Sequence, residues 1–288
     1  MNKLMLYHID LDKSVGENFS EYEYSEDGIP LVRFSRKHNW QSNPVTVCQF
    51  ALHHFNKYIR EKRAESAEIF KKQVSWLLQN TENGPNNSMV WYYKLDIPFY
   101  KLNSPWISGM AQGEALSVFV RAFQLTDDEK YLDVAHNVFK IFKLRTQEGG
   151  VTGKYESGGL VIEEYPTEPC SCVLNGFILA LFGIYDYAEI SGDAEAQQFF
   201  EKCTESLIDN LHNYDTGYWS LYDLYKPYRL TSQSYHRLHS MLLDRLYEIT
   251  KNSEFKETSD RWKAYTNSVK SKSKWFIHKI KYKLHQNG

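Results

Sequence analysis

Acidic residues and tyrosines that could transfer protons gather in segments between the helices that the sequence predicts. The acids are Glu163, Glu164, Asp215 and Asp223. Two facing carboxyl groups are what an inverting or a retaining glycosidase requires. Each acid could instead be a turn or cap residue on the solvent-exposed surface. For Asp215, within NYDTGYW, the turn role is favoured. The sequence does not decide which acids face each other.

Tyrosines accumulate in the same segments, and they are Tyr155, Tyr165, Tyr218, Tyr222, Tyr225, Tyr228 and Tyr235. Such rings can stack on a sugar or fill space. A phenol with a pKa of about 10 is a poor base at neutral pH, but nearby cations and hydrogen-bond donors can lower that pKa enough for proton transfer. Cationic candidates lie close in sequence, namely Lys226, Arg229, His236 and Arg237.

Other catalytic patterns are missing from the sequence, which has no phosphate-binding glycine loop, no GxSxG and no HExxH. His236 and His239 could share a helix face, but no third ligand with convincing spacing accompanies them. We therefore expect hydrogen-bonding histidines at the rim of the site rather than a metal centre. The four cysteines lack CxxC spacing and are interpreted as reduced thiols: Cys48, Cys170, Cys172 and Cys203.

A repeat in the sequence provides the elements that would position these residues. An aliphatic residue, a Thr or Ser, a polar turn and apolar residues at helical spacing recur at 125–142, 190–207 and 249–265. A more apolar helix-length run precedes each of them, at 108–124, 171–190 and 235–249. An earlier pair lies at 43–59 and 63–79, with Asn43 as a possible cap. Each unit is therefore a helical hairpin.

The apolar first helices belong inside and the charged second helices outside, which closes repeated hairpins into an α/α toroid. We expect a mainly α fold, a partial α/α toroid of about four hairpins with short β-hairpins at the rim and a small N-terminal strand region. The long connections 81–105, 146–169 and 213–232 all run from an outer helix to the next inner one, so they gather at one end. The side chains of EEYPTEP, residues 163–169, should then look into the mouth of a cavity.

Composition excludes several classes of protein. With 288 residues, 42% of them hydrophobic, and a net charge of -2, the chain is globular, and its dispersed charges do not predict nucleic-acid binding. The start MNKLMLYHID has no apolar core of a secretion signal, and the run from Val173 to Tyr185 is too short to cross a bilayer, so a cytoplasmic location is expected. The end, KSKSKWFIHKIKYKLHQ, has the composition of a basic helix that rests on the inner face of an anionic membrane, or of a tail whose apolar residues pack on the domain.

Several motifs together resemble the helical catalytic domain of the glucuronyl C5-epimerases that act on heparosan and heparan sulfate precursors. These motifs are SGMAQGEALSVFVRAFQLT, EEYPTEPCSCVLNGFILALFGIYDYAE, NYDTGYWSLYDL and YHRLHSMLL, in order from about residue 43 to residue 262. The resemblance implies a cofactor-free reaction. The proton on C5 of a D-glucuronyl unit is removed from one face and replaced on the other, which gives L-iduronate within a glucuronate-containing polysaccharide.

The resemblance also assigns roles to residues. Proton transfer falls to Tyr165, Tyr222 and Tyr235, and Glu164 would hydrogen-bond the sugar or a phenol. Contact with the substrate is implied for Met110, Ala111, Gln112, Gly113 and Asn175. Where the family has an arginine soon after its YDL, this chain has Tyr225 and Lys226, so the carboxylate clamp is expected at Lys226 or Arg229, with donor help from His236 and Arg237.

The resemblance further implies a homodimer, since in the family a partner subunit completes the cleft. We expect an N-terminal extension with a β-hairpin over 1–42, the toroid over 43–270 and a basic amphipathic tail over 271–288. Two alternatives to an epimerase stay open. A polysaccharide lyase also begins by removing the C5 proton, and a catalytically inactive polysaccharide-binding module needs only the fold.

Overall fold

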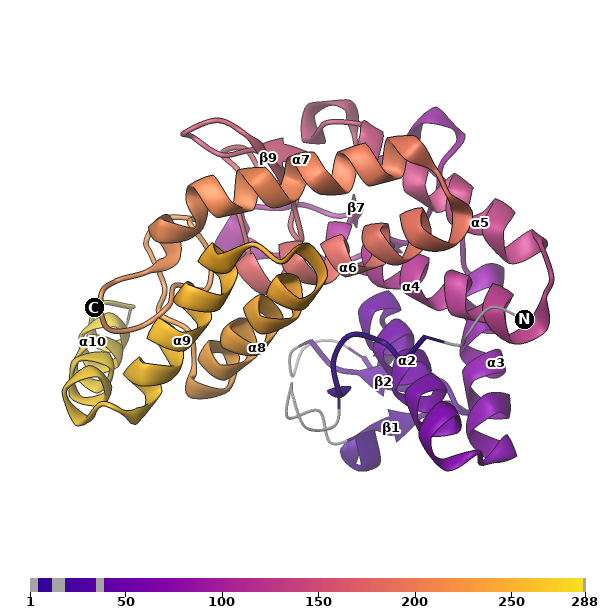
Figure 1. The fold of residues 1–288 in the computed structure, drawn as a ribbon, viewed down its shortest axis with the longest axis horizontal. Coiled ribbons are helices and arrows are strands. Elements are labelled where there is room, and N and C mark those ends of the chain that lie inside the picture. The colour runs from indigo at the N-terminus through magenta and orange to yellow at the C-terminus, as the bar shows by residue number, and fades with distance from the viewer. Residues whose placement is uncertain (1–4, 12–18, 35–38, 287–288) are drawn as a thin grey trace.

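The computed structural model describes residues 5–11, 19–34 and 39–286, and in them four helical hairpins follow one another (Figure 1). The hairpins are α2 (Pro44–Glu61) with α3 (Ala64–Gln79), α4 (Gly109–Thr126) with α5 (Lys130–Phe139), α6 (Leu174–Ser191) with α7 (Ala194–Asn210), and α8 (Gln233–Thr250) with α9 (Ser253–Asn267). The predicted partial α/α toroid is confirmed. In Figure 1 the first hairpin lies toward the right of the molecule and the last hairpin toward the left.

The first helix of each hairpin lies inside, and α4 and α6 form the centre. Their backbones approach so closely that a Cβ on Gly113 would lie 2.3 Å from Ala180 Cα, and one on Gly183 would lie 1.7 Å from the Gly113 carbonyl oxygen. Only glycine fits at these two positions. The close contact locks the two central helices into one register, and α2 and α8 pack beside them.

Side-chain caps fix where the inner helices begin at the rim. The Asn43 side chain accepts a hydrogen bond from Val45 N (3.1 Å), which confirms its predicted role as the cap of α2. Ser108 caps α4 by accepting from Ala111 N, and Ser232 caps α8 by accepting from Tyr235 N. These caps hold the first turns of the helices next to the connections that carry the candidate residues.

The connections between hairpins form two-stranded antiparallel hairpins at one end of the toroid, as expected. Their strands are β4 (Glu82–Asn83) with β5 (Met89–Val90), β6 (Tyr92–Tyr93) with β7 (Trp106–Ile107), and β8 (Thr152–Lys154) with β9 (Leu160–Ile162). The third connection is tied to α6 by backbone bonds from Leu174 N to Tyr222 O and from Leu224 N to Ser171 O. The chain after β9 and the loop around Tyr222 therefore share one wall.

The expected N-terminal strands are present as a small antiparallel sheet. It consists of β1 (Glu23–Tyr24), β2 (Pro30–Val32) and β3 (Gln41–Ser42), with β2 in the middle and packed on α2. Part of the sequence predicted as this hairpin, residues 35–38, lies outside the described residues. Phe34, two residues after β2, lines the cavity described below.

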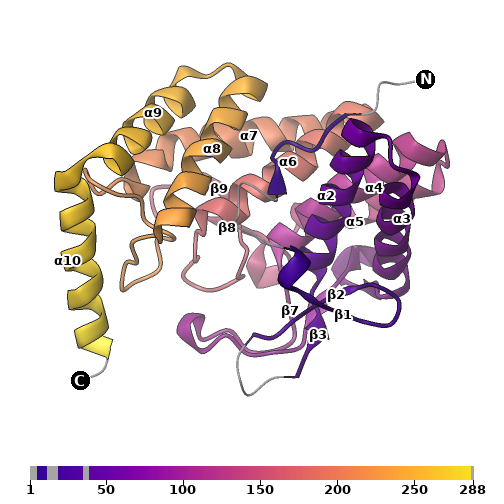
Figure 2. The ribbon, with the colours of Figure 1, turned by 90° about the horizontal axis from the view of Figure 1, so that it is seen from below.

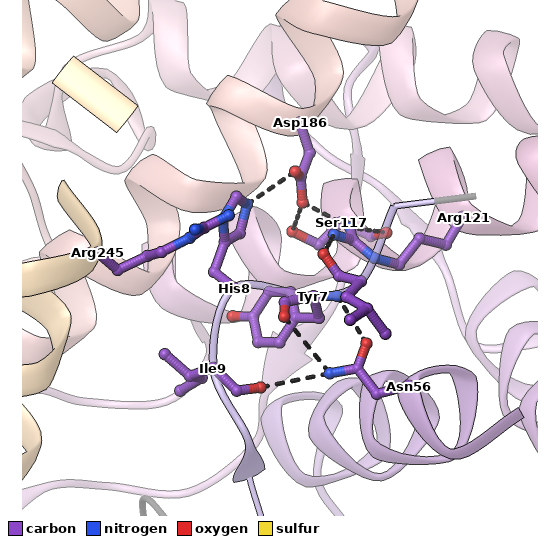
Figure 3. A network of polar contacts seen from close by, with 9 residues as sticks. Tyr7, His8, Ile9, Asn56, Ser117, Arg121, Asp186 and Arg245 are labelled. Carbon is purple, nitrogen blue, oxygen red and sulfur yellow. Dashed lines mark hydrogen bonds and ion pairs between the residues drawn. The ribbon is translucent and has the colours of Figure 1, made fainter. Parts of the chain in front are cut away.

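An N-terminal segment, residues 5–11, contacts the C-terminal halves of the inner helices, whose first turns are at the rim, and Figure 3 shows its polar contacts. Asn56 on α2 bonds the backbone of Tyr7 and Ile9, and the Arg121 guanidinium on α4 donates to Leu6 O at 3.1 Å. His8 lies 2.8 Å from Asp186 on α6 and receives a hydrogen bond from Arg245 on α8 at 3.1 Å. The segment thus ties all four inner helices together.

A buried ion pair is the centre of that network. Arg121 donates to Asp186 at 2.5 Å, Ser117 donates to the same oxygen at 2.7 Å, and both charged side chains have no exposed surface. Burial alone would raise the pKa of Asp186, but Arg121 and His8 hold that pKa below its ordinary value. The carboxylate is therefore ionised at neutral pH and compensates the Arg121 charge.

A last helix, α10 (Val269–Gln286), follows α9 at the edge of the molecule (Figure 2). Trp275 Nε1 donates to Thr231 O at 2.8 Å, and Lys279 Nζ donates to Leu230 O at 2.6 Å, so the helix rests on the third rim connection. Other apolar residues of α10 are exposed, namely Phe276, Ile277 and Ile280. In the described ranges, no helix has the length and apolarity that a membrane span requires.

Candidate active site

A cavity of about 190 Å³ lies at the rim and brings residues from all four inner-helix regions together. Its lining includes Met110 on α4, Glu164 and Tyr165 after β9, Asn175 on α6 and Tyr235 on α8. All five were candidates from the sequence. Acid-base groups on separate elements thus face one space large enough for part of a sugar.

Tyr165 is held in place by a column of aromatic rings. Its ring stacks on Tyr100 at a centroid distance of 4.6 Å and contacts Trp106 at 5.5 Å, and Trp106 in turn stacks on Tyr93 at 4.4 Å. The Tyr93 hydroxyl donates to Asn43 at 2.6 Å, so the helix cap also anchors this column. A side chain packed in this way is held in a single orientation for a reacting group.

Glu164 is the neighbouring carboxyl group, and it is buried. Burial raises its pKa to about 7, although hydrogen bonding with the Tyr165 phenol and the charge of Arg229 act in the opposite direction. A Cβ on Gly176 would lie 2.3 Å from Glu164 Oε2, so glycine at that position of α6 leaves room for the carboxyl group. A carboxyl with this pKa can accept and release a proton near neutral pH.

Two buried oxygens at the cavity are available to a ligand. Within the described part of the chain, Glu164 Oε2 and Asn175 Oδ1 have no hydrogen-bond partner. Asn175 is 4% exposed and sits in the first turn of α6, ahead of the apolar run from Phe177 to Ile184. Buried acceptors of this kind are normally paired, so both oxygens are suited to bind hydroxyl groups of a bound sugar.

Tyr222 and Tyr235 lie next to each other and form a pair of phenols. Their ring centroids lie 5.4 Å apart in an edge-to-face arrangement, and the Arg229 guanidinium lies 5.0 Å from the Tyr222 ring. Tyr222 is held by the backbone bond from its N–H to Arg229 O at 2.8 Å. The three tyrosines that the resemblance selected therefore belong to one region of the rim.

The expectation that cations lower the pKa of the phenols is wrong for Tyr165 and Tyr222. Burial raises the pKa of both well above the ordinary value, and the nearby Glu164 carboxyl raises each further. The positive charge of Arg229 opposes this at Tyr222 without reversing it. Both phenols are neutral at rest and can donate a proton, and either one accepts a proton only if it passes its own on.

Arg229 belongs to a second buried network that the sequence did not reveal. Its guanidinium pairs with Asp223 and donates to the Tyr100 hydroxyl, while Tyr100 donates to Asp223 at 2.6 Å. The guanidinium also lies 3.8 Å from the centroid of the Phe99 ring. Tyr100 was missed because nothing in IPFYKL marks it out, and its partners lie more than a hundred residues away in sequence.

Three of the four MAQG residues do not reach the cavity. Gly113 is the close-packing position between α4 and α6, and Ala111 has no exposed surface beneath Tyr93 and Trp106. The amide of Gln112 is also fully buried. In the orientation that satisfies both of its polar atoms, its nitrogen donates to Met89 O and its oxygen accepts from Trp91 N. The expected substrate contacts of Ala111, Gln112 and Gly113 are corrected to structural roles, and Met110 alone of this motif lines the cavity.

His236 is likewise not at the rim. It is fully buried, stacks on Trp219 at 4.1 Å, and bonds the Ser220 hydroxyl at 2.7 Å and Trp262 O at 3.0 Å. Burial lowers its pKa to about 4, so it carries no charge that could help a carboxylate. Its expected role as a substrate contact is therefore corrected to a structural one, and His239 bonds the same Ser220 hydroxyl.

The remaining basic candidates lie apart from the cavity. Lys226 lines a larger groove of about 930 Å³, together with Lys154, Glu156 and Glu168. Arg237 is exposed on α8. Of the cationic residues proposed from the sequence, Arg229 is the one whose charge acts on Glu164.

Two of the four candidate acids hold local structure. Glu163 accepts hydrogen bonds from the backbone N–H groups of Ser171 (2.5 Å) and Cys172 (2.8 Å), which fixes the loop before α6. Asp215 accepts from Gly217 N at 2.8 Å, so its predicted turn role is confirmed. Asp223 pairs with Arg229, so Glu164 is the one of the four candidate acids that lines the cavity.

Comparison with known proteins places this geometry in a family. Residues 85–264, more than half of the chain, match the family model described as D-glucuronyl C5-epimerase C-terminus. The chain belongs to this family. The resemblance seen in the motifs is thereby confirmed, and the match includes Tyr100, Tyr165, Tyr222 and Tyr235 but ends before α10.

Individual relatives agree with the family model. The chain is 34% identical to a D-glucuronyl C5-epimerase of Caenorhabditis elegans over 235 residues, which is 74% of this chain and 37% of that protein. It is 28% identical to an uncharacterized protein of Methanocaldococcus jannaschii over 240 residues, or 78% of this chain and 77% of that one. The chain thus spans little more than a third of the nematode enzyme.

Solved structures of other enzymes share the fold. A cellobiose 2-epimerase from Bacillus thermoamylovorans matches with a TM-score of 0.58 at 13% identity, over 86% of this chain and 66% of that one. The GH76A α-1,6-mannanase from Salegentibacter sp. matches with a TM-score of 0.56 at 14% identity, over 91% and 70%. At such identities the likeness shows the fold alone.

Proposed function

We propose that the chain is a uronate C5-epimerase that converts D-glucuronate to L-iduronate units within a heparosan-like polysaccharide. The observation that carries the proposal is the cavity in which Glu164 and Tyr165 lie on one element and Tyr235 on another. Inversion of a carbon centre needs one proton acceptor and one donor on opposite faces of the sugar. Membership of the C5-epimerase family supports an epimerase of carbohydrates.

The reaction removes one proton and returns one. A base takes the hydrogen of C5 as a proton, and the electron pair of the broken C–H bond moves into the adjoining carboxylate. A donor on the other face then protonates C5, and the electron pair forms the new C–H bond. No atom is gained or lost, and the cost lies in the extra negative charge on the carboxylate in the intermediate.

Glu164 and Tyr165 together supply the acceptor. Because the phenol is neutral at rest, it takes the C5 proton only as its own proton passes to the ionised Glu164. A carboxyl whose pKa is about 7 is half ionised at neutral pH, which suits this relay. The Tyr222 and Tyr235 pair supplies the donor, and Arg229 stabilises the added charge.

A homodimer is part of this proposal, because the resemblance implies that a partner subunit completes the cleft. Light scattering coupled to size-exclusion chromatography tests it. A species of twice the mass of the 33.9 kDa chain is expected. A purely monomeric active enzyme contradicts it.

One experiment tests the function against its rivals. The protein is incubated with N-sulfated heparosan in deuterated water, and C5 is followed by nuclear magnetic resonance. Deuterium at C5 together with iduronate supports the epimerase. An unsaturated product that absorbs in the ultraviolet identifies a lyase instead, and binding without exchange identifies a non-catalytic module.

A further inference from the structure

A second cavity, of about 330 Å³, lies between the catalytic tyrosines and α10. Tyr222, Arg229, Ser232 and Tyr235 line it from the rim connection and the start of α8. His278, Lys279 and Tyr282 line it from α10. Since Tyr235 also lines the first cavity, a sugar chain that places one unit there can extend its neighbour into the second.

The charge of this cavity is positive. Of the described residues, those that line it include Arg229 and Lys279 and no carboxylate. Asp223 compensates the charge of Arg229, whereas the Lys279 ammonium donates to the backbone carbonyl of Leu230. Burial and the charge of Arg229 both lower the pKa of Lys279, so an anion placed between the two cations would relieve their repulsion.

Neutral donors complete the lining. Ser232 and Tyr235 contribute hydroxyl groups, and His278 contributes a buried Nε2 for which the described residues provide no hydrogen-bond partner. The larger groove around Lys226 differs in kind, because Glu156 and Glu168 line it together with the lysines. The cavity at α10 is therefore the better candidate for an anionic ligand.

Three residues of α10 hold the helix in its position. Trp275 packs on Trp219 at 5.5 Å and donates to Thr231 O, and Lys279 donates to Leu230 O. Lys274 lies 5.4 Å from the centroid of the Tyr218 ring. The helix begins after residue 264, where the match to the family model ends.

We propose that the cavity between α10 and the tyrosines is a binding subsite for the anionic sugar unit next to the one that reacts. Lys279 binds the anionic group, which is the carboxylate of a uronate or the sulfate of an N-sulfated glucosamine, and His278 donates a further hydrogen bond. This inference rests on the proposed function for the identity of the polymer. It makes α10 a part of the substrate site.

Titration calorimetry with heparosan oligosaccharides, N-sulfated or N-acetylated, tests the subsite without requiring turnover. Lys279→Gln should weaken binding roughly tenfold, as expected for one charge-assisted contact, and Lys279→Arg should retain most of it. Lys272→Gln, on the exposed side of α10, should bind as the wild type does. A loss with both oligosaccharides identifies a carboxylate at Lys279, and a loss with the N-sulfated one alone identifies a sulfate.

Removal of Lys279 also removes a hydrogen bond that holds α10 on the third connection, so His278→Gln serves as a second variant that leaves the Trp275 and Lys279 contacts in place. It should weaken binding severalfold with unchanged thermal unfolding. The inference is overturned if Lys279→Gln and His278→Gln both bind like the wild type, or if Lys272→Gln loses as much as Lys279→Gln. Sedimentation with phosphatidylserine vesicles tests a membrane role. If Lys279→Gln and Lys272→Gln lose vesicle binding equally while sugar binding is unchanged, α10 is assigned to a membrane surface instead.

The two proposals fail separately. A wild-type protein that binds the oligosaccharides but exchanges no C5 proton removes the epimerase and leaves the subsite supported by its variants. A wild-type protein that exchanges C5 while Lys279→Gln and His278→Gln bind normally removes the subsite alone. Absence of any binding by the wild type overturns the subsite.

Discussion

At the residue scale, the environment of each side chain separates the tyrosines and acids that line the cavity from those that hold structure. Glu163 and Glu164 are adjacent in sequence and both have a pKa raised to about 7 by burial. The first binds backbone N–H groups of a loop, whereas the second lines the cavity. Neighbours in sequence therefore take different roles because the chain presents them to different surroundings.

Tyr165→Phe should lower C5 exchange about 100-fold or more, because it removes the hydroxyl that relays the proton and keeps the ring that stacks on Tyr100. The rate of deuterium incorporation measures the effect, and circular dichroism should show an unchanged fold. Tyr58→Phe, on α2 and far from the lining of the cavity, is the matched control. Exchange at the wild-type rate in Tyr165→Phe would remove this phenol from the mechanism.

The rate of exchange should rise with pH through about 7, the pKa of Glu164. The sign follows from the role of the carboxyl group, which accepts a proton only when it is ionised, and ionisation increases as pH rises through that pKa. Glu164→Gln should abolish this rise together with most of the activity. A flat pH profile between pH 5 and 8 in the wild type would contradict the assignment.

The direction of these pKa shifts could not be predicted from sequence. The nearness of Lys226, Arg229 and His236 along the chain favoured lowered phenol pKa values, but burial decides the sign, and burial is set by packing from several elements. Tyr100 shows the same limit, since it meets Asp223 and Arg229 only through the fold. Position between the predicted helices gave a set of seven tyrosines, which is local information, and the family resemblance selected Tyr165, Tyr222 and Tyr235 from that set.

At the element scale, the pairing of hairpins was predictable because helical periodicity and caps are local signals. The close contact between α4 and α6 was less predictable from sequence. MAQG was assigned to the substrate, yet Gly113 serves the approach of two backbones. A glycine at a helix start can serve a ligand or a neighbouring helix, and only the position of the second helix decides between them.

Gly183→Ala should lower the free energy of unfolding by about 1–3 kcal/mol or more, since the new methyl group would collide with the Gly113 carbonyl at 1.7 Å. Alanine is otherwise the better helix former, so a loss of stability isolates the packing effect. Urea unfolding followed by circular dichroism measures it, with Glu189→Ala on the exposed side of α6 as the control. Stability equal to or above that of the wild type would show that the helices can separate at little cost.

At the scale of the whole molecule, the N-terminal segment and the rim occupy opposite ends of the toroid. His8 receives a hydrogen bond from Arg245 at Nδ1 and lies against Asp186 through Nε2, so its neutral form donates to Asp186. Burial lowers the pKa of His8. Its contribution to stability is thus present above the ordinary histidine pKa and is lost as pH falls below it.

Asp186→Asn should lower the free energy of unfolding by about 3–5 kcal/mol, because Arg121 would keep a buried charge without its carboxylate. Urea unfolding at neutral pH measures the change. Glu68→Gln, which breaks the exposed pair with Lys71, should change stability by less than about 1 kcal/mol. A small effect of Asp186→Asn would mean that the segment and its network contribute little to the fold.

The anchoring of residues 5–11 also governs how the chain folds. These residues are synthesised before the hairpins, yet their contacts require Asp186 on α6 and Arg245 on α8, which are synthesised much later. Each hairpin can form locally as it is completed, but the segment that joins the inner helices cannot dock until most of the chain is present. Closure of the far end is therefore expected as a late folding step, after the four hairpins have formed.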